Sequence, residues 1–177
     1  MELYNGRPTD VENRSEKELE CYSFLKRLDI DFKRVDHQAA DTMDVCLNIE
    51  ITLGAPICKN LFLCNRQQTE FYLLMMPGDK PFKTKDLSAQ IESSRLSFAN
   101  AENMEKYLGT TPGSVSVLGL MNDTEAKVKL LIDEDILKSE FFGCHPCVNT
   151  SSLRIKVSDL IEKIIPDMKR NYIKVKL

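Results

Sequence analysis

Hydrophobic positions recur every three or four residues in several segments of the chain, a spacing typical of helices that bury one face. Ser15 followed by Glu18 forms a capping-box pattern and predicts a helix that runs to about Leu28. Thr42 and Ser158 are the expected N-caps of a second helix and of the last one. Together, these signals predict helices at residues 15–28, 42–53, 86–92, 101–108 and 158–165, the last of them stopped by Pro166.

Other segments carry the patterns of strands. Residues 59–64 and 70–76 are apolar on both faces and are joined by a polar loop, which predicts a central antiparallel hairpin. Alternation of apolar and polar positions predicts half-buried strands at residues 128–133 and 153–157. Shorter strands are expected at residues 32–35 and 172–175. Helices and strands mix without a regular alternation, so the predicted fold class is α+β, with a mixed, mostly antiparallel sheet flanked by helices.

Composition and charge narrow the class of protein. A chain of 177 residues, 42% hydrophobic and 29% charged, fits one ordinary globular domain, which we expect to span residues 1–177. No apolar run approaches the roughly 20 residues that cross a bilayer, and the N-terminal residues resemble no secretory signal. These features predict a cytoplasmic protein without a membrane partner.

The net charge of -3 argues against DNA as a partner, because nucleic-acid binding would depend on local basic patches and not on the overall field. Two candidate patches are Lys80, Lys83 and Lys85, and Lys169, Arg170, Lys174 and Lys176. Solvated surface charge is the competing interpretation of both.

Six cysteines in a chain without an export signal predict reduced thiols and not a disulfide framework. Four of them are expected as small core residues: Cys21, Cys46, Cys58 and Cys64. Cys144 and Cys147 spell C-x-x-C, which is also the pattern of a redox or zinc site. Redox chemistry needs a lowered thiol pKa, usually from a following helix, and here a loop and a strand are expected to follow. We expect no metal and no cofactor, and a redox or zinc protein remains an alternative.

Three features could carry chemistry. His145 lies in a Pro-containing loop before a strand, where packing does not require a histidine, whereas His37 fits the end of a strand. The glycine-rich residues 109–119 could offer backbone N–H groups to an oxyanion or could form a plain turn. Lys59 begins an apolar strand, where its charge could bind a phosphate or carboxylate or simply reach solvent.

Four sequence blocks in a fixed order carry a resemblance: KNLFL from Lys59, LSFA from Leu96, LGTTPGSV from Leu108 continuing to GLMND at Gly119, and His145-Pro146 with Asn149-Thr150. This order resembles the YbaK family of editing domains associated with prolyl-tRNA synthetase, and most closely its freestanding members. The resemblance implies a mixed fold around a strongly bent sheet and hydrolysis of mischarged tRNA(Pro). It also implies alanine as the usual amino acid removed by the freestanding branch and cysteine as that of the YbaK branch.

By the same resemblance, Lys59 is the essential lysine, His145 the active-site histidine, and residues 113–116 the substrate loop. Lys59, helped by Asn60, would hold the acceptor end of the tRNA, and backbone N–H groups of the loop would face the aminoacyl group. The expected loop positions are Gly113, in a catalytic role, and Ser114, Val115, Ser116 and Val117, which bind substrate.

Val117 stands where the family's loop has proline, which predicts a change in loop rigidity and pocket shape. The resulting hypothesis is an Ala-tRNA(Pro) deacylase that acts in trans, with prolyl-tRNA synthetase as a candidate partner. The alternatives are a Cys-tRNA(Pro) deacylase and a non-catalytic binder of tRNA or synthetase.

Overall fold

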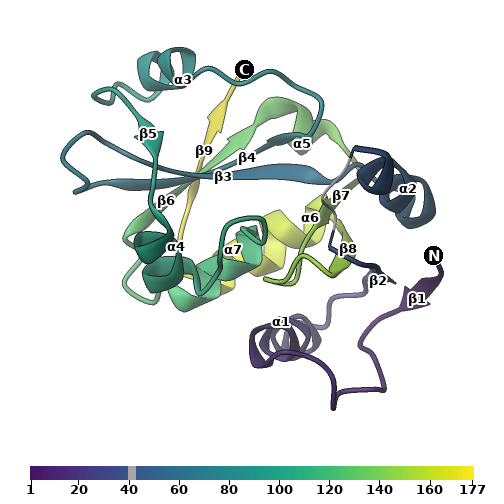
Figure 1. Ribbon diagram of the computed structural model, residues 1–177. Helices are drawn as coiled ribbons and strands as arrows, with labels where there is room; N and C mark the ends of the chain where they lie inside the picture. The colour runs from purple at the N-terminus through teal and green to yellow at the C-terminus, as the bar shows by residue number, and fades with distance from the viewer. Residues whose placement is uncertain (40–42) are drawn as a thin grey trace.

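The computed structural model describes residues 1–39 and 43–177 and divides the strands over two sheets (Figure 1). The first sheet is antiparallel throughout and has the order β1 (Leu3–Asn5), β2 (Lys33–Asp36), β8 (Ser151–Lys156), β7 (Phe141–Cys144). The second has the order β5 (Ser97–Phe98), β3 (Cys58–Cys64), β4 (Phe71–Pro77), β6 (Val128–Asp133), β9 (Tyr172–Val175). Its β5–β3–β4 part is antiparallel and its β4–β6–β9 part is parallel.

This arrangement confirms the α+β class and the central hairpin of β3 and β4. An isolated bridge between Ile57 and Gly143 joins the two sheets just before β3 and within β7. The join brings the start of β3 next to the segment that carries His145.

The helices are α1 (Glu16–Arg27), α2 (Met43–Leu53), α3 (Thr84–Gln90), α4 (Ala101–Leu108), α5 (Glu134–Lys138), α6 (Val157–Asp159) and α7 (Ile165–Asp167), with a 3-10 helix at Val117–Asn122 and a π-helical turn at Leu160–Ile164. Ser15 caps α1 as predicted, because its side chain accepts the N–H of Glu18. Gly109 ends α4 in the left-handed conformation at φ 61°. The predicted cap Thr42 lies outside the described residues.

The last helical segment differs from its prediction at both ends. It begins at Val157, so Ser158 lies inside the first turn and caps nothing. It also continues past Pro166, because the turn before the proline is widened and the N–H of Ile165 donates to the Leu160 carbonyl five residues back. The wide turn accommodates a residue that has no N–H of its own.

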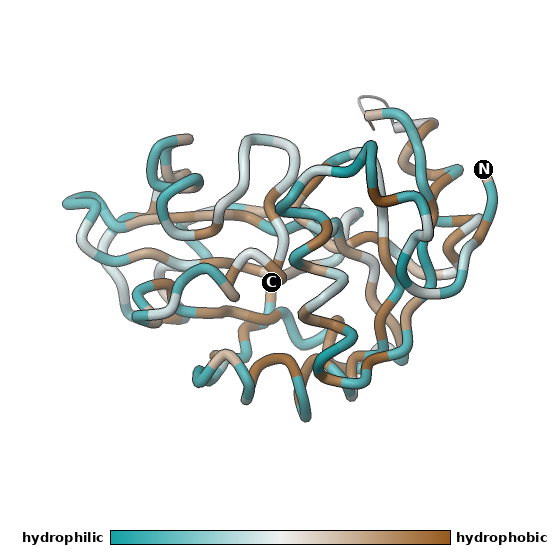
Figure 2. Tube along the Cα trace, turned by 90° about the horizontal axis from the view of Figure 1, so that it is seen from below, coloured by the Kyte–Doolittle hydropathy of each residue, from teal (hydrophilic) through white to brown (hydrophobic). Residues whose placement is uncertain are grey.

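Apolar side chains fill both faces of the second sheet, and Figure 2 shows the hydrophobic stretches along its strands. One core cluster packs against α1, α4 and the π-helical turn, and the other packs against α3. The half-buried prediction for residues 128–133 is therefore wrong: Leu131 and Asp133 are fully buried, because α3 and the C-terminal residues cover the second face of β6. No helix in the described part of the chain is both long and apolar enough to span a membrane.

The join between the sheets requires glycine at position 143. A Cβ atom there would lie 2.9 Å from the Pro56 carbonyl oxygen and 3.0 Å from the Ile57 Cα, and both are backbone atoms. We expect Gly143→Ala to lower the free energy of unfolding by about 1–3 kcal/mol, the usual cost of overpacking. Urea unfolding followed by circular dichroism measures this, and an unchanged midpoint would contradict the close approach of the two sheets.

Candidate active site

Three segments that are far apart in the sequence meet beside the first residues of β3. The bridge of Ile57 and Gly143 holds β3 against the end of β7. The hydroxyl of Ser116 lies against the thiol of Cys144, which comes directly before His145. A Cβ atom on Gly113 would lie 3.8 Å from the Nδ2 atom of Asn149, so the glycine-rich loop contacts the segment after His145. The structure therefore brings together the predicted loop and the segment that carries the predicted histidine.

The hydroxyl groups of the loop maintain its shape. The Ser114 Oγ atom accepts the N–H of Thr111 at 3.1 Å and donates to the Thr111 carbonyl at 2.9 Å. The Ser116 Oγ atom accepts the N–H of Leu118 at 3.2 Å and so caps the 3-10 helix. Both side chains are buried. Any contact of Ser116 with a substrate would therefore come from its backbone, and the side chain of Ser114 is occupied within the turn.

Several backbone donors of the loop are left over. The N–H of Ser114 donates to the Thr111 carbonyl at 3.0 Å. Within the described residues, the N–H groups of Gly113, Val115, Ser116 and Val117 bond to no protein acceptor. Gly113 is exposed and has φ 89°, a conformation that favours glycine. Backbone donors without a protein acceptor are the groups that an oxyanion would need, and the simple-turn interpretation does not account for them.

Val117 occupies a position that proline would also fit. It is the first residue of the 3-10 helix, and Ser116 before it is extended at φ -146° and ψ 149°. Proline is favoured at the first helical position and requires an extended residue before it. The loop backbone therefore has a proline-compatible conformation although valine is present.

We expect Val117→Pro to change the free energy of unfolding by less than about 1 kcal/mol, because the restriction of the unfolded chain, which stabilises by about 0.4–1 kcal/mol, offsets the packing lost with the fully buried valine. Denaturant unfolding of the two proteins measures the difference. A loss of about 3 kcal/mol or more would show that the loop backbone does not accept proline.

The two predicted residues at the start of β3 lie on opposite faces of the strand. Lys59 shares its face with Leu61, which packs with the α3 cluster, and Asn60 shares its face with Cys58 and Phe62, which belong to the cluster that includes Val117. The prediction that they support the same end of the tRNA thus requires the Lys59 side chain to reach around the strand.

Their polar atoms differ in exposure and in hydrogen bonding. The exposed Lys59 ammonium donates to the Lys80 carbonyl at 3.0 Å, and no carboxylate pairs with it in the described part of the chain. The Asn60 Nδ2 donates to the Cys58 carbonyl, whereas the buried Oδ1 has no hydrogen-bond partner. A positive charge and a hydrogen-bond acceptor therefore lie next to the join between the sheets.

His145 is held by a backbone carbonyl. Its Nδ1 atom lies 2.9 Å from the Ser151 carbonyl oxygen, which can only accept. Burial lowers the pKa of His145, the bond to Ser151 opposes this shift, and the His37 ring 6.2 Å away acts in the same direction as burial. The ring is therefore neutral at neutral pH and offers its Nε2 lone pair as an acceptor. His37 lies at the end of β2, as the sequence predicted, and is half-buried.

The buried cysteines of the described residues lack the features of a redox site. None of the six cysteines forms a disulfide. Burial raises the pKa of Cys144, which is the opposite of what thiol redox chemistry needs. The Cys147 Sγ lies 3.5 Å from the Cys21 Sγ, and this contact together with burial raises the pKa of Cys21 well above its ordinary value. Cys46 is only partly buried, so its assignment to the core is wrong, whereas Cys21, Cys58 and Cys64 are core residues.

Both candidate basic patches lose members to internal ion pairs. The Lys80 ammonium binds Asp133 at 2.9 Å and Asp135 at 2.8 Å. Arg170 is buried against Asp123 at 3.3 Å. The exposed lysines that remain in the two patches are Lys83, Lys85, Lys169, Lys174 and Lys176, the last of them 3.7 Å from Glu134.

Three surface cavities of about 540–590 Å³ lie away from these residues, along α1, beside the turn after α7, and across the first sheet where β1, β2, β7 and β8 meet the segment before β2. Neither Lys59, Gly113 nor His145 lines them. The candidate site is therefore identified by the chemical groups of its residues and not by the volume of a cavity.

Comparison with known proteins identifies the family of this chain. A family model described as aminoacyl-tRNA editing domain matches residues 37–163. The prolyl-tRNA editing protein ProX of Acetoanaerobium sticklandii is 32% identical over 141 residues, which cover 80% of this chain and 85% of that protein. Prolyl-tRNA synthetase associated domain-containing protein 1 of Danio rerio is 29% identical over 147 residues, which cover 82% of this chain and 78% of that protein.

Solved structures share the fold. A crystal structure described as a candidate trans-editing enzyme for prolyl tRNA synthetase aligns with a TM-score of 0.71 and 15% identity, over 93% of this chain and 98% of the other. The family match contains Lys59, the glycine-rich loop and His145, and it confirms the resemblance found in the sequence. The chain therefore belongs to the aminoacyl-tRNA editing domain family and is an aminoacyl-tRNA deacylase.

Proposed function

We propose that this chain hydrolyses the ester of mischarged tRNA(Pro), with Ala-tRNA(Pro) as its preferred substrate, and that it acts in trans as one domain in the cytoplasm, where tRNA is charged. The names of its relatives support prolyl-tRNA as the substrate class. The observation that carries the proposal is the row of unbonded N–H groups at Gly113, Val115 and Ser116 beside the segment of His145.

The reaction adds water to an ester that is already activated. Water attacks the carbonyl carbon, the bond to the ribose oxygen breaks, and that oxygen takes up a proton, which releases the amino acid and the free 3′ end of the tRNA. In the proposal, the loop N–H groups stabilise the oxyanion of the tetrahedral intermediate. The His145 Nε2 accepts a proton or a hydrogen bond from the attacking water. The vicinal ribose hydroxyl assists from the substrate side.

The remaining residues position the tRNA end. Lys59 supplies the unpaired positive charge for a phosphate of the acceptor end, and the Asn60 Oδ1 accepts from the ribose or the α-ammonium group. Val115 borders the aminoacyl group, and the fully buried Val117, which was expected from the sequence to bind substrate directly, supports the loop from the core. Selectivity comes from exclusion of the bulkier proline. An enzyme that rejects by size hydrolyses the error and spares Pro-tRNA(Pro).

The proposal is tested by the release of amino acid from Ala-tRNA(Pro), Cys-tRNA(Pro) and Pro-tRNA(Pro) by the purified chain. We expect fast loss of the alanyl ester and a prolyl ester as stable as in buffer. Fast loss of the cysteinyl ester alone would assign the chain to the other branch. If all three esters survive as in buffer while the tRNA binds, the chain is a binder and the proposal fails.

The pH dependence of the reaction follows from His145. Its pKa is lowered in the folded protein, so the neutral ring persists below the ordinary histidine value of about 6.5. We expect kcat/KM for Ala-tRNA(Pro), corrected for buffer hydrolysis, to be level above neutral pH and to fall only as the pH drops below that value. His145→Ala should lose this acid limb together with most of the activity. A limb centred above pH 6.5 would contradict a neutral buried ring.

A further inference from the structure

We propose that Ser152 and His37 are positioning residues that hold the His145 ring with its proton on Nδ1 and its lone pair on Nε2. The consequence for catalysis rests on the proposed function, whereas the arrangement itself is a property of the free protein. Neither residue belongs to the sequence blocks that mark the site.

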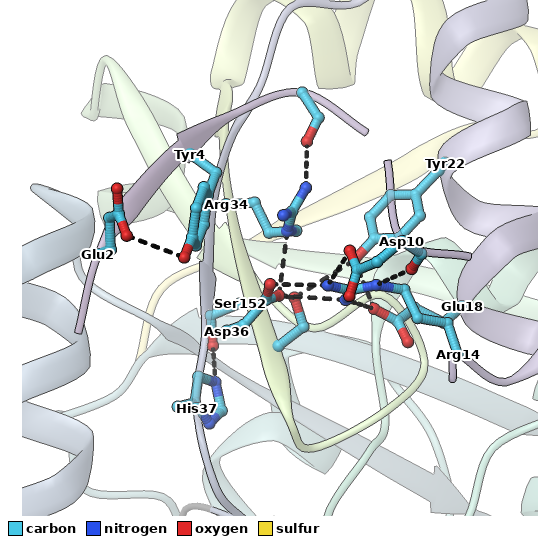
Figure 3. A network of polar contacts seen from close by, with 12 residues as sticks. Glu2, Tyr4, Asp10, Arg14, Glu18, Tyr22, Arg34, Asp36, His37 and Ser152 are labelled. Carbon is cyan, nitrogen blue, oxygen red and sulfur yellow. Dashed lines mark hydrogen bonds and ion pairs between the residues drawn. The ribbon is translucent and has the colours of Figure 1, made fainter. Parts of the chain in front are cut away.

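A row of short contacts connects the two rings. The His145 Nδ1 lies 2.9 Å from the Ser151 carbonyl oxygen and 3.4 Å from the Ser152 Oγ. The same Ser152 Oγ lies 2.9 Å from the His37 Nε2, a contact drawn in Figure 3. The His37 Nδ1 lies 2.7 Å from the Gln38 carbonyl oxygen.

Only one placement of protons satisfies this row with both rings neutral. Carbonyl oxygens only accept, so each ring must carry its proton on Nδ1. The His37 Nε2 is then a lone pair and takes the single hydroxyl proton of Ser152. Because that proton is committed to His37, Ser152 can only accept from His145. The hydroxyl therefore cannot donate to the His145 Nδ1, which would favour the other tautomer.

The backbone around the row is fixed on both sides. Asp36 of β2 pairs with Ser151 of β8, and the next N–H, that of His37, donates to the Thr150 carbonyl at 2.9 Å. Ser151 and Ser152 are fully buried. A row built on a ladder between two strands holds the rings more precisely than a loop would.

A charge cluster on the other side of Ser151 supports the same ladder. The Asp36 carboxylate accepts from Arg14 at 2.7 Å and from Arg34 at 3.0 Å (Figure 3). It also accepts from the Ser151 hydroxyl at 3.1 Å. The two guanidinium groups hold the pKa of Asp36 below its ordinary value despite burial. The carboxylate therefore stays charged and keeps the Ser151 hydroxyl on its own side, while the Ser151 carbonyl serves His145.

The consequence for the reaction is a defined acceptor. The His145 Nε2 has no hydrogen-bond partner among the described residues. With the proton held on Nδ1, this atom presents a lone pair to water or to the substrate in every molecule of the neutral protein. The wrong tautomer would present a donor there and would not accept a proton from the attacking water.

The test is nitrogen-15 NMR of the ring nitrogens in the free, uniformly labelled protein. The chain contains only two histidines, so each ring is assigned by its loss in a variant. We expect both rings of the wild type in the Nδ1–H form above neutral pH. An Nε2–H form of His145 in the wild-type protein would overturn the proposal without any variant.

Variants then test the role of Ser152. His37→Leu removes the acceptor and frees the Ser152 proton, so the Nε2–H share of His145 should rise. His37→Gln, which can place an amide oxygen near the former Nε2, should leave the tautomer as in the wild type. His37→Leu combined with Ser152→Ala removes the freed donor and should restore the Nδ1–H form. An unchanged tautomer in His37→Leu would overturn the proposal.

Kinetics separate this proposal from the proposed function. In His37→Leu, we expect kcat for Ala-tRNA(Pro) to fall about tenfold with little change in KM, the lower end of what loss of a supporting partner costs. If no tRNA ester is cleaved by the wild-type protein but the tautomer responds as described, the proposed function fails and the positioning role stands. If the esters are cleaved but the tautomer does not respond, the positioning role alone fails.

Discussion

Replacement of Lys59 by alanine is expected to lower kcat/KM for Ala-tRNA(Pro) by about 10–10²-fold, because a charge-assisted hydrogen bond to a phosphate contributes about 1.5–3 kcal/mol. Among the residues that the structure describes, the Lys59 ammonium donates to the neutral Lys80 carbonyl at 3.0 Å and pairs with no carboxylate. By contrast, the Lys80 ammonium is neutralised by Asp133 and Asp135. Lys59 therefore offers a positive charge without a carboxylate partner, within the described part of the chain, to a phosphate of the acceptor end. Single-turnover deacylation measures the loss.

The control removes an equal charge elsewhere. Lys26 is an exposed lysine of α1, and Lys26→Ala should leave the rate within about twofold of the wild type, because screened surface charges contribute little. Equal rates for Lys59→Ala and Lys26→Ala would show that Lys59 does not bind the substrate. Circular dichroism should show both variants folded, since both side chains reach solvent.

The second large effect is expected on stability. Asp123→Ala should lower the free energy of unfolding by about 3–5 kcal/mol, because it leaves a buried arginine without its carboxylate. Arg170 and Asp123 expose only 4% and 2% of their side chains. Asp123 also accepts the N–H groups of Lys127 and Val128 at the start of β6. Urea unfolding measures the loss.

A neighbouring pair provides the control. Glu125 pairs with Lys127 at 3.6 Å and is 76% exposed. Glu125→Ala should cost less than about 1 kcal/mol, as is usual for surface ion pairs. If Asp123→Ala is no more destabilising than Glu125→Ala, the ion pair of Asp123 with Arg170 does not anchor the end of the 3-10 helix to the turn between α7 and β9.

The local elements of the fold were predictable because their signals are local. Alternation and apolar runs identified β3, β4 and β9. The capping residues of α4, Asn100 and Gly109, directly flank the residues that have helical spacing, so both ends of this helix have a local signal. The division into two sheets was not predictable, because it depends on the pairing of β2 with β8, more than a hundred residues apart. The end of the last helix was misjudged because the wide turn before Pro166 has no sequence signal of its own.

The site was predictable only in part. Motifs identified the glycine-rich loop and His145, whose segments the fold brings together. Neighbouring residues of a strand point to opposite faces, so the sequence already implies that Lys59 and Asn60 lie on opposite faces of β3. The family resemblance alone does not indicate this. The support of His145 by Ser152 and His37 could not be seen, because serine and histidine at these spacings carry no signal until β2 and β8 are paired.

The central claim is that the loop, the start of β3 and the segment of His145 form one site for the aminoacyl end of tRNA. The most direct measurement is a titration of the labelled protein with a non-hydrolysable amide analogue of 3′-alanyl-adenosine 5′-phosphate, followed by amide NMR shifts. We predict that the largest shifts fall on Lys59, Asn60, residues 113–117 and His145, and that the prolyl analogue produces much smaller ones. Saturable shifts confined to another surface, such as the cavity beside α1, would contradict this account.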